Sequence, residues 1–351
     1  MSKEQARITW IDMAKGYGIL FVIIGHLGDS FLRNEFYTFH MPLFFFLSGC
    51  VFSASKYNFK EFLLRKIQTI LIPYITLGIP MILYTFWEMY SNYQRNTSDY
   101  INVIKSFIIQ ERMWTLWFIA CLFFLEVLFY LLVKLVKDNY IKLGLITVIL
   151  TVAGLIYYKV GGIPLPWNID VCLTGISFFY VGYLLKNIQK LQEILFKNKL
   201  RIVNPILFFV LNLVCGAETV RISGSGLEMF ESRYGFAPLT FLAAFAGIFF
   251  VIIFSYSVDI KPIRYIGKNS LVYYAWHQTI LIPIIEKVYK ELHIFQFMGF
   301  SKTRYYIKMG TSLIIICIIL TIVDLVIRHT KLKFMVGQKV SIKSKESFQE
   351  L

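Results

Sequence analysis

The chain has 351 residues, of which 57% are apolar, 17% are aromatic and only 16% are charged. Soluble domains are roughly 45–50% apolar and about 25% charged, so this composition excludes a water-soluble globular domain. The formal charge of +15 would suit a nucleic-acid-binding protein, but the placement of the basic residues along the chain favours a membrane protein instead.

Apolar runs long enough to cross a membrane recur along the whole chain. A helix rises about 1.5 Å per residue, so some 20 apolar residues cross a hydrocarbon layer of about 30 Å. The runs are continuous rather than alternating, which favours helices over a β-barrel. We therefore predict an all-α fold, a polytopic bundle of about ten transmembrane helices, near residues 11–31, 36–54, 69–90, 114–133, 143–160, 169–186, 202–218, 236–257, 270–289 and 306–327.

Lysine and arginine are distributed unevenly between the two sides of this bundle. With the N-terminus in the cytoplasm, the inner segments hold 24 of the 36 basic residues and the outer segments hold 12. The positive-inside rule then predicts that both termini are cytoplasmic. We expect a transmembrane domain over residues 1–328 and a basic cytoplasmic tail over residues 329–351, which suits anionic lipid. The sequence has no convincing internal repeat.

Ionisable side chains inside a membrane are costly and often functional, and five of those in the predicted spans are candidates for a functional role. They are His26, His40, Glu126, His277 and Asp324. Glu126 has two interpretations: it orients a histidine or binds a cation, or it is a protonated acid in an interhelical hydrogen bond. On sequence grounds alone, a structural role is the simpler expectation for His40, His277 and Asp324.

His26 has a partner on its own predicted helix. Lys15 lies eleven residues earlier, close to three turns, so both side chains point to one face about 16 Å apart. A neutral His26 inside the bundle can accept a proton from a hydroxyl, while Lys15 at the cytoplasmic mouth can hold an anionic ligand. The alternative is that His26 hydrogen-bonds a neighbouring helix and that Lys15 merely extends to the membrane edge.

The five cysteines all fall in apolar spans. None of them has the paired spacing of a zinc or redox motif. We interpret them as small hydrophobic residues and predict no metal site.

Several short motifs occur in one order along the chain. They are residues 11–16 (IDMAKG) leading to His26, residues 39–49 (FHMPLFFFLSG), residues 65–74 (RKIQTILIPY), residues 116–118 (LWF), residues 178–186 (FFYVGYLLK) and residues 265–270 (YIGKNS) leading to His277. In this order the sequence resembles the acyltransferase-3 family of bacterial integral membrane O-acyltransferases, especially its fucose-4-O-acetylase-like branch. Many members carry two basic residues three apart in the third motif, whereas here Lys66 is followed by Thr69, with Arg65 as a possible substitute.

The resemblance implies an O-acetyltransferase of the bacterial plasma membrane. Such an enzyme moves an acyl group, usually acetyl, from cytoplasmic acetyl-CoA to a hydroxyl of a cell-surface polysaccharide or of its lipid-linked precursor. The expected partners are membrane lipid, the carbohydrate acceptor and polysaccharide-synthesis proteins, but no nucleic acid.

The resemblance also implies roles for individual residues. The base would be His26, either deprotonating the acceptor directly or forming a covalent acyl-histidine. The remaining predicted site residues are Glu126 and His277 as its assistants, and Lys15, Arg65 and Lys66 as binders of the donor phosphates.

Two other functions fit a helical bundle. One is export of surface polysaccharide, although no pair of Gly- or Pro-interrupted spans in corresponding halves marks an inverted repeat. The other is an assembly subunit without chemistry, although a buried histidine and an inner basic residue on one helix face are costly in a scaffold.

Overall fold

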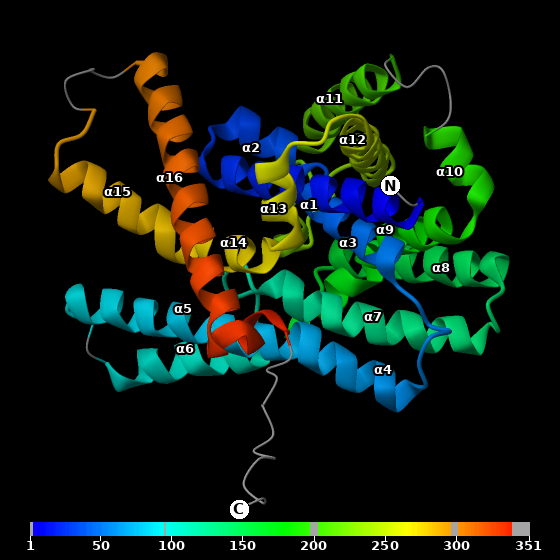
Figure 1. The fold of residues 1–351 in the computed structure, drawn as a ribbon, viewed down its shortest axis with the longest axis horizontal. Coiled ribbons are helices and arrows are strands. Elements are labelled where there is room, and N and C mark those ends of the chain that lie inside the picture. The colour runs from blue at the N-terminus through cyan, green and yellow to red at the C-terminus, as the bar shows by residue number, and fades with distance from the viewer. Residues whose placement is uncertain (1–2, 95, 197–202, 296–300, 339–351) are drawn as a thin grey trace, which may run out of the picture.

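The computed structural model describes residues 3–94, 96–196, 203–295 and 301–338, and in this part of the chain every regular element is helical. The predicted all-α fold is confirmed. The α-helices are α1 (Lys3–Leu27), α2 (Ser30–Tyr37), α3 (His40–Val51), α4 (Phe59–Lys66), α5 (Ile72–Ser91), α6 (Thr97–Ile109), α7 (Trp117–Leu135), α8 (Tyr140–Lys159), α9 (Ile169–Asn187), α10 (Gln189–Phe196), α11 (Val203–Ser223), α12 (Ala237–Ser257), α13 (Lys261–Lys268), α14 (Ser270–Trp276), α15 (Ile282–Glu291) and α16 (Lys302–His329) (Figure 1).

Shorter helical turns join some of these helices. Two of them are π-helical, η1 (Ile67–Leu71) and η5 (His277–Leu281). Three are 3₁₀-helical, η2 (Pro166–Asn168), η4 (Met229–Glu231) and η7 (Lys331–Val336). Because η1 and η5 continue directly from α4 to α5 and from α14 to α15, each series forms one long helical path.

Eight segments of the described chain are long and apolar enough to cross a membrane, so this is a multi-pass membrane protein. They coincide with eight of the ten predicted spans. The segments are Thr9–Leu27, Phe59–Ser91, Trp117–Leu135, Tyr140–Lys159, Pro166–Asn187, Pro205–Ser223, Ala237–Ser257 and Lys302–His329. On which side of the membrane the termini lie stays a prediction.

The two other predicted spans take different forms. In the predicted span at residues 36–54, α3 has only 12 residues, about 18 Å of helix, which is shorter than the hydrocarbon layer. At the predicted span 270–289, α14, η5 and α15 form a continuous path over residues 270–291, whose last third carries Glu286, Lys287 and Lys290. The first is therefore too short to be one of the eight segments. The second is long enough, but its polar residues 277–279 and its charged residues make it less apolar than the eight.

The short helix α3 lies at the centre of the bundle, packed against α1, α9 and α12. Ten of its twelve residues are buried. The backbones of α3 and α9 pack closely at two glycines. A methyl group on Gly49 would overlap the carbonyl oxygen of Phe179, and one on Gly182 would overlap that of Phe46. Small residues at such crossings are typical of membrane helices, where close packing stabilises the bundle.

The same kind of contact joins α1 to α13. A methyl group on Gly16 would overlap the carbonyl oxygen of Ile263, and one on Gly267 would overlap that of Asp12. The glycine that follows Lys15 therefore belongs to a helix crossing. This packing fixes α1 around residues 12–16.

The two π-helical turns share a sequence. Residues 68–73 and residues 278–283 both read QTILIP, a short repeat that the sequence analysis did not recognise. In each turn a backbone N–H bonds five residues back, from Ile72 to Ile67 and from Ile282 to His277. A proline follows immediately in both, and its ring would clash with the carbonyl four residues earlier in a regular α-helix.

After the last long helix, η7 packs against α5, where the Thr76 hydroxyl donates to the Met335 carbonyl at 3.2 Å. Asp324 accepts hydrogen bonds from Tyr265 and Arg328, both at 2.8–2.9 Å, which agrees with a structural role. The division at residue 328 stays a prediction, because α16 ends at His329 and residues 339–351 lie outside the described residues.

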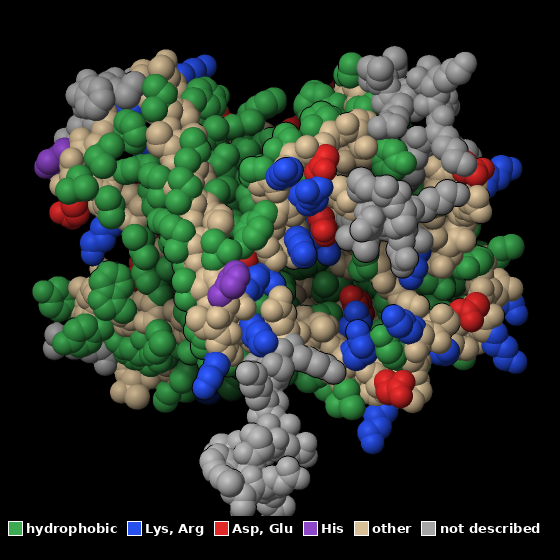
Figure 2. Space-filling view, in the orientation of Figure 1, with side chains coloured by type: hydrophobic (Ala, Val, Ile, Leu, Met, Phe, Trp, Pro, Cys, Tyr) green, Lys and Arg blue, Asp and Glu red, His purple; other side chains and the backbone are tan. Residues whose placement is uncertain are grey.

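Side chains on the molecular surface also divide by type. Ile314, Ile318 and Ile322 recur every four residues along α16 and are each more than half exposed, as a lipid-facing stripe requires. Figure 2 shows hydrophobic side chains over much of α16, whereas Lys and Arg gather over α13, α4 and the C-terminal end of α16. This agrees with a membrane protein whose basic residues cluster at one end of its helices.

Candidate functional site

A cavity of about 300 Å³ lies at the end of the bundle where α1 finishes. It is bounded by the last turns of α1, by α2, by the start of α3, and by the segments before α7 and before α12. The side chains that line it include His26, Arg33, Tyr37, His40, Trp117, Glu228 and Gln278. Imidazole, phenol, carboxylate and guanidinium groups thus meet in one hollow, as in a typical small-molecule site.

His26 stands in the last turn of α1. The chain reverses directly after it, because the Asp29 side chain caps α2 by accepting from the Leu32 N–H at 3.0 Å. This reversal brings the Tyr37 hydroxyl within 3.1 Å of Nδ1 of His26. A proton on Nδ1 would be donated to the phenol oxygen, which leaves the Nε2 lone pair available as a base.

His277 lies beside His26, with the ring centroids 5.2 Å apart. It is fully buried, and its Nδ1 lies 2.9 Å from the Tyr273 carbonyl and 3.0 Å from that of Tyr274. Since carbonyls only accept, Nδ1 carries the proton and Nε2 keeps its lone pair. Among the described residues Nε2 has no hydrogen-bond partner.

A third histidine completes this group. The His40 ring lies 4.7 Å from the Tyr37 ring, and its Nδ1 is 2.7 Å from the Phe36 carbonyl. The structure therefore brings His26, His277 and His40 together around one tyrosine. Two of the three predicted catalytic residues lie in this group, while their roles remain predictions.

An ion pair stands at the mouth of the cavity. Arg33 lies 3.4 Å from the Glu228 carboxylate, and its guanidinium sits over the Tyr37 ring at 5.0 Å. Burial raises the pKa of the Glu228 carboxyl, an effect that the Arg33 charge partly offsets. The pair connects α2 to the turn that precedes α12.

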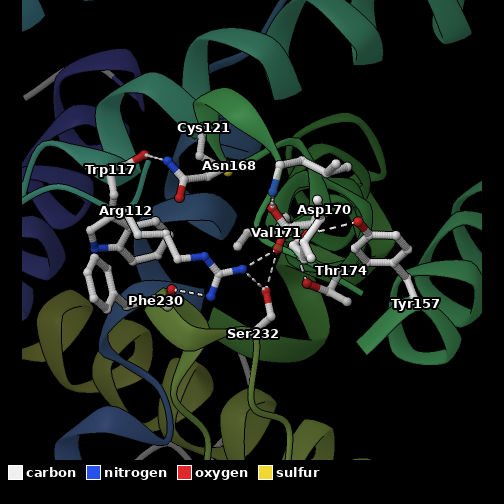
Figure 3. A network of polar contacts seen from close by, with 12 residues as sticks. Arg112, Trp117, Cys121, Tyr157, Asn168, Asp170, Val171, Thr174, Phe230 and Ser232 are labelled. Atoms are coloured by element: carbon white, nitrogen blue, oxygen red, sulfur yellow. Dashed lines mark hydrogen bonds and ion pairs between the residues drawn. The ribbon is translucent and has the colours of Figure 1, made fainter. Parts of the chain in front are cut away.

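That turn is anchored by a buried network around Arg112 (Figure 3). Glu228 and Arg233 form an antiparallel bridge, which closes the turn. Arg112 donates to the Phe230 carbonyl at 2.6 Å and to the Ser232 hydroxyl at 2.7 Å, and it forms an ion pair with Asp170. Ser232 in turn donates to Asp170 at 2.7 Å.

Sequence reasoning missed this network. Asp170 falls at the second position of the predicted span 169–186. An ionisable residue in an apolar run is a candidate functional residue, so this position could have identified it. Arg112 lies in a predicted outer loop, where an arginine is common and does not indicate a buried ion pair. Only the fold shows that the two residues meet beneath the cavity wall.

The other predicted site residues lie about three helical turns away, toward the start of α1. Lys66 forms an ion pair with Glu126, which is only 4% exposed. Lys15 is close enough to interact electrostatically with Glu126 and Asp12. Arg65 is exposed on α4 and packs over the Tyr57 ring at 4.4 Å.

The structure thus groups Lys15, Lys66 and Glu126 and places them apart from the histidines. For Glu126 this geometry favours a role with the basic residues rather than as a partner of His26. In the described part of the chain there is no cluster of three or more His, Cys, Asp or Glu side chains able to hold a metal ion.

Comparison with known proteins identifies one family. The family described as an acyltransferase domain, acyltransferase-3, matches residues 8–323. No curated protein and no solved structure matches the chain. The matched region contains both groups of residues, the histidines with Tyr37 and the lysines with Glu126.

Proposed function

Because this membrane protein belongs to the acyltransferase-3 family, we propose that it is an O-acetyltransferase of the bacterial plasma membrane. It would move an acetyl group from cytoplasmic acetyl-CoA to a hydroxyl of a cell-surface polysaccharide or of its lipid-linked precursor. The observation that carries this proposal is the pair of His26 and Tyr37 in the wall of a cavity at the end of α1, with His277 beside His26 and Lys15 about three turns earlier in the same helix.

The donor end of the site is the group around Glu126. The acetyl-CoA phosphates would bind near Lys15, Arg65 and Lys66, which supply positive charge at the predicted cytoplasmic side. Glu126 holds Lys66 in place through their ion pair. The extended pantetheine arm would then follow α1 toward His26, a distance of about 16 Å for eleven residues of helix.

The transfer itself needs a base at the acceptor hydroxyl. Nε2 of His26 takes the hydroxyl proton as the oxygen attacks the thioester carbonyl, and Tyr37 holds the tautomer that makes this possible. The tetrahedral intermediate then collapses, the carbon–sulfur bond breaks, and the CoA thiolate receives the proton from His26. Such a base is worth about a hundredfold to ten-thousandfold in rate.

His277 is suited to hold the acceptor. Its Nδ1 proton is occupied by two backbone carbonyls, so its buried Nε2 offers only an acceptor lone pair. A second hydroxyl of the sugar could donate to this atom while the first faces His26. Orienting the acceptor in this way lowers the barrier because both reactants are held in position.

The test compares cells that carry wild type, His26→Ala, a deletion, or the control His329→Ala, which changes an exposed histidine at the inner end. Mild base releases acetyl from purified surface polysaccharide, and total polymer is measured in parallel. We expect His26→Ala to match the deletion and His329→Ala to match wild type, with equal polymer in all strains.

The two other functions give different results in the same experiment. A polysaccharide exporter would lose surface polymer in His26→Ala, with the acetyl content per sugar unchanged. An assembly subunit would tolerate changes at His26 and Lys15. Either outcome, in a variant present in the membrane at the wild-type level, would contradict the proposed acyl transfer.

A further inference from the structure

A second and larger hollow lies near the histidine cavity, between the end of α5, helix α15 and the start of α16. Its volume is about 620 Å³. Figure 1 shows α15 and α5 extending to the same side of the molecule. Tyr305 and Tyr306 of α16 donate to the Leu27 carbonyl and the Asp29 carboxylate, so this is the end of the bundle where α1 finishes.

The walls of this hollow carry aromatic rings and charges of both signs. Tyr84 donates to Glu88 at 2.7 Å, and Lys287 lies over the Trp87 ring at 5.1 Å. Lys308 forms an ion pair with Glu286 on the opposite wall. Carboxylates that accept, amines that donate and flat rings suit a ligand rich in hydroxyl groups better than a strongly anionic one.

An apolar groove of about 360 Å³ adjoins this polar hollow. The two share Tyr84, Trp87, Lys287 and Glu291. Beyond the shared residues the groove is lined by Ile284, Val288 and Leu292, which are 38%, 44% and 66% exposed and face outward from α15. A polar hollow that opens sideways into an apolar groove fits an amphiphile with a polar head and a hydrocarbon chain.

We propose that this double groove binds a lipid-anchored saccharide, with the sugar head in the polar hollow and the first part of the lipid chain in the apolar groove. The assignment of this ligand as the acyl acceptor rests on the proposed function. Helix geometry supports the connection: Gln278 lines the histidine cavity while Glu286, eight residues and about 12 Å further along the same helical path, lines the polar hollow.

The experiment uses the full-length protein in phosphatidylcholine nanodiscs and two photoreactive lipids with the same diazirine-bearing acyl chain. One is a diacylglycerol with a single hexose head, and the other is phosphatidylcholine. Cross-linked peptides are identified by mass spectrometry in wild type and in His26→Ala. We expect the glycolipid to label residues 84–92 and 283–292 about tenfold more than the phospholipid in both proteins.

Glycolipid labelling of three variants distinguishes a specific binding site from general contact with lipid. Trp87→Ala removes an aromatic wall and Glu88→Gln removes a carboxylate, and each should reduce glycolipid labelling severalfold. Leu145→Ala changes a side chain on α8 that is 61% exposed and should leave it unchanged. Trp87 is itself 49% exposed, so its loss does not open the core.

Equal labelling by the two lipids, or labelling that Trp87→Ala and Glu88→Gln leave intact, would overturn this inference by showing ordinary lipid contact. That result would not contradict the proposed acyl transfer. Conversely, preferential labelling of a wild-type protein that shows no acyl transfer in the polysaccharide assay would support the groove while contradicting the proposed function. The two results are distinguishable because the labelling reports binding and needs no turnover.

Discussion

The ion pair between Arg112 and Asp170 offers the sharpest test of how the cavity wall is held. Asp170 is 4% exposed, and the Arg112 side chain is 12% exposed. The substitution Arg112→Met keeps most of the volume but leaves a buried carboxylate without its cation. Removing one partner of a buried pair costs about 3–5 kcal/mol, because the remaining charge is uncompensated. We therefore expect a loss of stability in this range.

The double variant Arg112→Met with Asp170→Leu should recover much of this loss. An apolar pair of similar volume in place of a buried ion pair is often neutral or stabilising. The comparison of both single variants with the double variant then gives the coupling free energy. Acyl transfer should stay reduced in the double variant, because the hydrogen bonds from Arg112 to the turn at Phe230 and Ser232 are lost in all variants that lack the arginine.

The free energy of unfolding is measured in mixed detergent micelles, with Arg221→Met as the control. Arg221 pairs with Glu218 on the surface, where the side chains are 72% and 40% exposed. Such exposed pairs contribute about 0–1 kcal/mol. If Arg112→Met cost no more than Arg221→Met, the network would not stabilise the turn, and the reasoning from burial would be refuted.

Three further predictions concern other parts of the molecule. Tyr37→Phe removes the acceptor of the His26 Nδ1 proton, so kcat should fall about tenfold, the equivalent of 1.4 kcal/mol, while the KM for acetyl-CoA stays constant; steady-state kinetics would contradict this if only KM changed. Burial raises the pKa of Glu35 from 4.5 to about 7, so the folded state binds this proton more tightly, and thermal stability should fall as the pH rises through that window; a Glu35→Gln variant should lack the dependence, and identical pH profiles would count against it. A methyl group in Gly182→Ala would overlap a backbone oxygen of α3, so the monodisperse fraction after detergent extraction should fall, unlike in Gly310→Ala, where the space is open; equal fractions would argue against the close crossing.

The fold followed from the sequence because membrane helices must satisfy their own backbone and need long apolar runs. Eight predicted spans match the structure for this reason. The prediction was less accurate for α3, since an uninterrupted apolar run does not reveal that the helix begins only at His40 and ends at Val51. Burial of ten residues in so short a helix depends on its neighbours, which the sequence does not specify.

The candidate site followed from the sequence only in part. Spacing along one helix relates Lys15 to His26, but no spacing relates either residue to a different helix. The contact of His26 with His277 and the pairing of Glu126 with Lys66 both depend on how helices are arranged around α1. Helix periodicity gives the face of a side chain, whereas the facing partner is set by packing.

The repeated segment QTILIP forms the same kind of π-helical turn in both groups of candidate site residues, beside Lys66 and beside His277. An α-helix turns about 100° per residue, so the extra residue of a π-helical turn rotates the chain before it relative to the chain after it. One such turn directly follows Lys66, and the other begins at His277. In each case the residues after the proline continue as a helix, while the candidate site residue before it, Lys66 or His277, contacts a partner on another helix. Inserted turns of this kind are frequent at functional sites, and here the proline makes the wider turn the less strained choice.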